Sequence, residues 1–213
     1  MIALALLLAA PVEAATPADW RRVATTDDRR RLRSWRSAWM DALASAGEEI
    51  HKDPALFSPD RALPGAEPPP GLYRCRTHKL GGRTGLLPYV AYPFFRCRVE
   101  ADGSFTKLDG SQRPVGRIHR DRAARAVFLG TMLLGDEVRP LRYGRDQRRD
   151  LAAWVERVGE RRWRMAFPYP HFESTLDLVE LVPAQGSVAT TGGGTMAGFG
   201  VTAGAGSGGS EAR

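Results

Sequence analysis

The chain has 213 residues and a formal net charge of +7, yet its composition argues against a nucleic-acid-binding protein. Among its 31 basic residues only Lys52, Lys79 and Lys107 are lysines, it contains no Asn, and its arginines often stand beside acids. This composition is typical of a GC-rich genome and indicates a solvated surface of mixed charge. We therefore expect no nucleic-acid partner.

The first residues predict export from the cytoplasm. Residues 2–10 form an apolar run that is too short for the roughly 20 residues of a membrane span. Small residues ending at Ala15 follow, as in a secretory signal, although no basic residue precedes the run. We expect residues 1–15 to be a signal peptide and the mature protein to be periplasmic or secreted, without a transmembrane segment.

Residues 20–52 predict an amphipathic helix. Thr25 can cap its free N–H groups, and apolar side chains then recur every three or four residues, on one helical face. These side chains are Leu32, Trp35, Trp39, Leu43, Ala46 and Ile50. Such a face could bind a partner, but we expect it to pack on its own domain. Residues 53–71 hold six prolines and predict an extended tether.

Residues 72–183 predict a β-barrel domain. Polar and apolar residues alternate with the period of strands that have one wet face and one dry face. The expected strands are 72–80, 88–100, 104–108, 115–120, 125–134, 150–158, 161–167 and 172–182. Residues 150–158 also fit helical spacing, but we interpret them as a strand that forms a hairpin through Gly159 and Glu160.

Eight strands with short turns predict a specific fold class. We expect a mainly β protein with an N-terminal helix and an eight-stranded antiparallel up-and-down barrel, lipocalin-like, with a lumen that is packed or holds one small ligand. Cys75 and Cys97 fall on the dry faces of neighbouring strands, so in an exported chain they predict one disulfide. Residues 184–213, nearly all Gly, Ala, Ser and Thr, predict a disordered tail.

No motif in the chain indicates catalysis or metal binding. G-x-S-x-G and H-E-x-x-H are absent, and the four histidines lack metal-ligand spacing. His78 and His119 share strands with arginines that face outward, which predicts surface histidines. Glu173 and Asp177 fall on the predicted wet face of the last strand, where an ion pair is expected. We therefore expect no catalytic residue, metal ligand or cofactor.

The chain resembles an uncharacterised family of exported bacterial proteins, classed only as a domain of unknown function. The resemblance runs from Trp20 to Pro183 and rests on the order of elements and on a few short motifs. The motifs are Gly103–Phe105, Arg161–Arg164, Pro168–Pro170 and Leu176–Leu181. The family implies no activity. More loosely, the disulfide and meander are similar to the calycin barrels, which include lipocalin-like carriers and periplasmic inhibitors of metalloproteases.

These observations favour a non-catalytic, monomeric envelope barrel that binds an apolar ligand or an envelope protein. Its expected contact residues are Tyr73, Trp163, Tyr169 and Phe172. The alternatives are a periplasmic inhibitor of a protease, or an enzyme of unrecognised type that uses Glu173, Asp177 or His171. A lumen of several hundred Å³ would favour a carrier, a packed lumen a protein-binding role, and a polar cleft with convergent titratable groups an enzyme.

Overall fold

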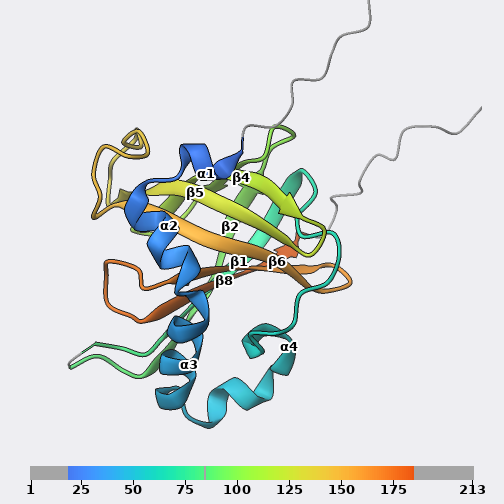
Figure 1. Cartoon of the computed structure of the whole chain (residues 1–213), viewed down its shortest axis with the longest axis vertical. Coiled ribbons are helices and arrows are strands. Elements are labelled where there is room, and N and C mark those ends of the chain that lie inside the picture. The colour runs from blue at the N-terminus through green and yellow to red at the C-terminus, as the bar shows by residue number, and fades with distance from the viewer. Residues whose placement is uncertain (1–18, 84, 185–213) are drawn as a thin grey trace, which may run out of the picture.

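A closed barrel of eight strands forms the centre of the protein in the computed structural model, which describes residues 19–83 and 85–184 (Figure 1). Each strand is antiparallel to the next, and the last strand closes the barrel on the first. The strands are β1 (Gly71–Leu80), β2 (Tyr89–Val99), β3 (Ser104–Lys107), β4 (Gln112–Arg122), β5 (Arg125–Leu134), β6 (Asp150–Gly159), β7 (Arg162–Pro168) and β8 (Leu176–Pro183). The predicted fold class is confirmed, and residues 150–159 are a strand.

The lumen-facing side chains pack into one core. Phe128 contacts Phe105 and Phe167 edge to face, with ring centroids 5.6 and 5.8 Å apart. Cys75 and Cys97 lie in the same core and form the predicted disulfide between β1 and β2, with Cα atoms 5.9 Å apart. Except near one end of the barrel, the lumen is therefore filled by the protein's own side chains.

The N-terminal helix is broken, where one continuous helix was predicted. The segment consists of α1 (Trp20–Val23), α2 (Thr26–Arg33), α3 (Trp35–Ser45), the 3₁₀ turn η1 (Glu48–Lys52) and α4 (Pro54–Phe57). The hydroxyl of Thr25 accepts the N–H of Asp28 and caps α2. Ser34, with ψ of 12°, separates α2 from α3. The break lets the segment follow the curved wall, with α2 against β6 and β7, and α3 against β1, β7 and β8.

The helices pack on the outside of the barrel, as predicted. Trp39 is 1% exposed and lies among side chains of β1, β7 and β8, and the indole of Trp154 on β6 donates to the carbonyl of Leu32 at 3.0 Å. This part of the barrel wall is therefore dry on both faces. Arg164 on β7, which alternation places opposite the core, is fully buried under the helices.

The Pro-rich segment is also packed, where a plain tether was expected. The N–H of Gly65 donates to the carbonyl of Ala123 at 2.8 Å, and the carbonyl of Gly65 accepts from the Trp163 indole at 2.9 Å. The hydroxyl of Tyr73 donates to the carbonyl of Pro69 at 2.6 Å. The segment therefore lies across one end of the barrel.

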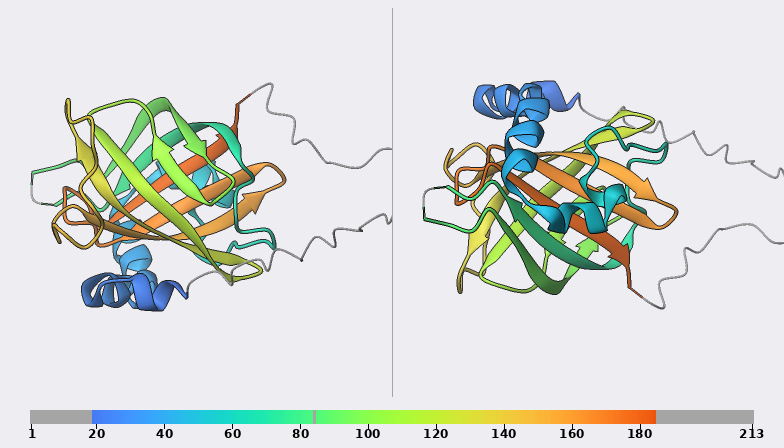
Figure 2. Two further views of the ribbon diagram at one scale, coloured as in Figure 1. Left: turned by 90° about the horizontal axis from the view of Figure 1, so that it is seen from above. Right: turned by 90° about the horizontal axis from the view of Figure 1, so that it is seen from below.

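The other end, which we call the mouth, carries the loops β1–β2, β3–β4, β5–β6 and β7–β8. Figure 2 shows that the loops β1–β2, β5–β6 and β7–β8 extend from this same end. The last strand begins at Leu176 and not at Phe172, because Tyr169 and Glu173 have positive φ angles of 46° and 65° and turn the chain back. The predicted signal peptide and the tail from residue 185 lie outside the described residues.

Candidate functional site

A pocket of about 120 Å³ opens at the mouth of the barrel. Its wall is mainly apolar and includes Phe95, Pro114, Met132, Leu151, Phe167, Phe172 and Val179. Polar and charged residues also line it, namely Thr77, Lys79, Tyr92, Lys107, Ser111, Gln112 and Asp177. The volume is below that of a lipocalin-type lumen of several hundred Å³, but it is close to the ~150 Å³ of a cavity that takes a benzene molecule.

Lys79, on β1, has its charge matched by neighbouring carboxylates. Its ammonium lies 2.8 Å from Oε2 of Glu173 and 3.6 Å from Oδ2 of Asp177. The side-chain oxygen of Gln112 accepts from the same ammonium at 3.4 Å. Burial opposes the charge, but the carboxylates of Asp177 and Glu173 outweigh it and raise the pKa of Lys79. Lys79 is therefore one half of an ion-paired group.

Asp177 lines the pocket, so its predicted place on a wet face is wrong. It pairs in register with Lys79, and its lumen-facing neighbour on β8 is Val179. The alternation pattern assigned the wrong face to the core, because Leu176 and Leu178 on the other face are also buried, under the helices. Burial raises the pKa of Asp177 although Lys79 lies close. Ser174 donates a hydrogen bond to Asp177.

Lys107, on β3, is buried with only 6% of the residue exposed. Its ammonium donates to the backbone carbonyl of Gln112 at 2.9 Å and lies 3.9 Å from the ring centroid of Phe95. No carboxylate of the described residues lies within ion-pair distance of this ammonium. Burial lowers the pKa of Lys107 from 10.5 to about 8.

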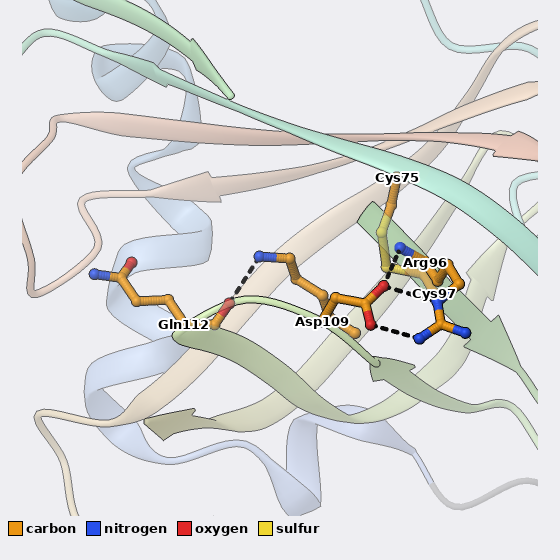
Figure 3. Close-up of a disulfide and its surroundings, with 6 residues drawn as sticks. Cys75, Arg96, Cys97, Asp109 and Gln112 are labelled. Carbon is orange, nitrogen blue, oxygen red and sulfur yellow. Dashed lines mark hydrogen bonds and ion pairs between the residues drawn. A yellow bond between two sulfur atoms is a disulfide. The ribbon is translucent and has the colours of Figure 1, made fainter. Parts of the chain in front are cut away.

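The β3–β4 loop, which follows Lys107, carries the carboxylate of Asp109, but this group pairs with Arg96 and not with Lys107. Asp109 accepts three hydrogen bonds from Arg96, one from the backbone N–H at 3.0 Å and two from the guanidinium at 2.9 and 2.8 Å (Figure 3). Gly110 then turns with φ of 87°, and a Cβ there would lie 3.2 Å from Nζ of Lys107. The glycine lets the loop close over the ammonium while Asp109 is held by Arg96.

The residues predicted to contact a ligand or partner lie in different places. Phe172 lines the mouth pocket. Tyr73 and Trp163 contact each other in the core, near the end covered by the Pro-rich segment. The hydroxyl of Tyr169 donates to Asp41 on α3 at 2.7 Å.

The acid–base residues of the enzyme alternative are only partly brought together. Glu173 and Asp177 meet at Lys79, whereas Nε2 of His171 lies 3.7 Å from Asp27 on α2, away from the pocket lining. Across residues 19–83 and 85–184, no group of three or more His, Cys, Asp or Glu side chains is placed to hold a metal ion.

One histidine is not where the sequence predicted it. His78 is buried, with Nδ1 3.0 Å from the hydroxyl of Tyr89, because the helical segment covers the outer face of β1. His119 is half-buried, and burial lowers its pKa.

The two pocket lysines were missed as site residues. Strand alternation alone could have found them, because Lys79 falls on the same face of β1 as Cys75, and Lys107 falls on the same face of β3 as Phe105. A lysine on the core-facing side of a strand, in a chain that has only three lysines, is the sequence feature that indicated a site.

A comparison with known families identifies the domain. The family model described as "Domain of unknown function (DUF4893)" matches residues 20–181, which span both the helical segment and the barrel. The chain belongs to this family. The predicted resemblance to an uncharacterised family is thus confirmed for the DUF4893 domain. No curated protein and no solved structure matches the chain. Within the described part of the DUF4893 domain, no helix is long and apolar enough to cross a membrane.

Proposed function

We propose that this DUF4893 domain is an exported, non-catalytic binding barrel whose mouth pocket holds a small, partly apolar molecule. One observation carries the proposal: a concave, mainly apolar pocket contains two buried lysine ammonium groups, of Lys79 and Lys107. Apolar walls with a few convergent polar groups are typical of small-molecule sites. A core built only for stability would leave no buried ammonium facing a cavity, because burying a charge is costly.

The pocket volume supports a small ligand. About 120 Å³ suits a molecule near the size of benzene, and the packed core below leaves no room for a long apolar chain. The side chain of a partner protein could occupy the same volume, and the experiment below separates the two occupants.

Export is supported by the signal-like residues 1–15 and by the disulfide. Disulfides persist in oxidising compartments and are rare in the cytosol, and the bond between Cys75 and Cys97 is buried in the core. We therefore place the domain in the periplasm or outside the cell.

An enzyme is the second candidate, and a specific observation favours it. Lys79, Lys107 and Asp177 converge on one pocket, and burial displaces the pKa values of Lys107 and Asp177 toward the neutral forms. Binding ranks first because Lys79 and Glu173 form a close ion pair and His171 lies elsewhere.

Native mass spectrometry of the protein purified from its own envelope tests the proposal. We expect a mass that lacks about the first 15 residues, together with an adduct of low mass. Val179→Phe fills the pocket and should abolish the adduct, whereas Leu72→Phe, at an exposed position outside the barrel, should keep it. An unprocessed chain would contradict export. A protein without an adduct, or one that retains only a partner protein, would contradict small-molecule binding.

A further inference from the structure

The ammonium of Lys107 has incomplete interactions within the described residues. A lysine ammonium has three N–H donors, of which one reaches the carbonyl of Gln112 at 2.9 Å. The ring of Phe95 covers another side, with its centroid 3.9 Å from Nζ. Neither group carries a negative charge. A buried ammonium in this setting requires a counter-charge, because the interior solvates it far less well than water does.

The acids near the pocket are already engaged. Arg96 donates three hydrogen bonds to Asp109, the acid next to Lys107 along the β3–β4 loop. Glu173 and Asp177 lie 2.8 and 3.6 Å from the ammonium of Lys79. Within residues 19–83 and 85–184, no acid is therefore left to pair with Lys107 at the pocket.

We propose that the ligand supplies this charge, and that it is a small monocarboxylic acid whose carboxylate pairs with Lys107. This inference rests on the proposed function and names its ligand class. One unmatched cation favours one negative charge, since the second charge of a phosphate monoester would find Lys79 already paired. The pocket of about 120 Å³ limits the apolar body to roughly six carbon atoms, by comparison with the benzene cavity.

The pocket also fits the apolar part of such an acid. Phe95, Met132, Leu151 and Phe167 form part of its wall, and Phe95 contacts the ammonium. With a pKa of about 8, Lys107 is still mostly protonated at pH 7, and the arrival of a carboxylate would strengthen its charged form. Apolar contact and one charge pair therefore act on the same small ligand.

Three probes of one shape and different charge test the inference: benzoate, benzyl alcohol and benzylammonium. We would titrate each into the full chain at pH 7 and follow the amide NMR signals of residues around the pocket. Benzoate should bind at least tenfold more tightly than benzyl alcohol, and benzylammonium should not bind. In the wild type, benzoate binding should weaken as the pH rises above about 8 and the free ammonium loses its proton.

Two variants assign the preference to one side chain. Lys107→Met keeps the length of the side chain and removes its charge, so the tenfold preference for benzoate should disappear while benzyl alcohol still binds. Lys52→Met is the matched control, because Lys52 is exposed on η1 and pairs with Glu49 away from the pocket. This control should retain the wild-type preference.

The outcomes separate the inference from the function it rests on. Binding of benzyl alcohol as tight as that of benzoate, or a preference that survives Lys107→Met or is insensitive to pH, overturns the carboxylate inference and leaves a binding barrel. If none of the three probes shifts the pocket signals, the small-molecule function fails together with the inference. Should Lys107→Met not fold, the pH dependence in the wild type decides alone.

Discussion

Two buried cations, Arg164 under the helices and Lys107 at the mouth of the barrel, differ in how completely the protein satisfies their charge. Under the helices, the fully buried guanidinium of Arg164 donates to Glu156 and to the carbonyls of Leu56, Ser58 and Arg61. At the mouth, Lys107 is nearly as buried but meets one carbonyl and one aromatic ring. The difference teaches that this fold can satisfy a buried cation completely, so the incomplete site at the mouth points to a missing partner.

The largest expected effect on stability comes from removing the counter-charge of Arg164 under the helices. Glu156→Gln removes the carboxylate that Arg164 and Arg125 share, and it leaves a buried guanidinium without its counter-charge. We expect the free energy of unfolding to fall by about 3–5 kcal/mol, measured by denaturant titration. Glu137→Gln is the matched control, because Glu137 also receives two hydrogen bonds from an arginine but is 37% exposed. It should cost less than about 1 kcal/mol. Similar losses in both variants would contradict the comparison.

A somewhat smaller loss is expected from the disulfide, which joins two strands next to the mouth lysine. Cys97 pairs in register with Lys107, and Phe94 on the outer face of β2 is exposed, so packing from outside gives little support there. Replacing Cys75 and Cys97 by Ala opens a loop with a sequence separation of 22 and should cost about 3 kcal/mol.

The measurement for the disulfide is the same denaturant titration, with the reduced wild type as a second reference. The doubly substituted and the reduced protein should lose similar stability. A variant as stable as the oxidised wild type would show that the bond does not support this side of the barrel.

A gain in stability is expected from removing the unmatched charge. Lys107→Met should raise the free energy of unfolding at pH 7 by about 1–2 kcal/mol, because the folded state no longer buries an ammonium. In the wild type the folded pKa of about 8 lies below the unfolded value of 10.5, so the unfolded chain binds more protons between these values. Wild-type stability therefore rises with pH in this window relative to the variant.

The comparison of the two unfolding curves at pH 7 and near pH 10.5 checks this sign. The advantage of Lys107→Met should be largest at pH 7 and lost near pH 10.5. A variant that is less stable than the wild type at pH 7 would mean that the hydrogen bond to Gln112 and the contact with Phe95 already satisfy Lys107.

Much of the fold could be predicted from the sequence, because local signals dominate it. Strand alternation located all eight strands. It also placed Cys75 and Cys97 on the core-facing sides of neighbouring strands, which predicted the disulfide. The helical stripe with Trp39 correctly predicted packing on the barrel, but the break at Ser34 depends on the curvature of a wall that the sequence does not display.

The site was harder to predict, because alternation shows which residues share a face and not which face meets the lumen. Where the helices cover the wall, both faces are dry, so Leu176 and Leu178 looked like the core and Asp177 like the surface. His78 was misplaced for the same reason. That Asp109 turns to Arg96 and leaves Lys107 without a carboxylate is decided by the conformation of one loop.

The most direct test of the unmatched ammonium is a pH titration of the lysine side chains by NMR. The chain has three lysines, so selective labelling gives three signals, each assignable by a Lys→Arg variant. We predict a midpoint near pH 8 for Lys107 in the free protein, a midpoint above 10.5 for Lys79, and an upward shift of Lys107 alone when benzoate is added. A midpoint of 10.5 or above for Lys107, with no response to benzoate, would contradict a buried cation that awaits its partner.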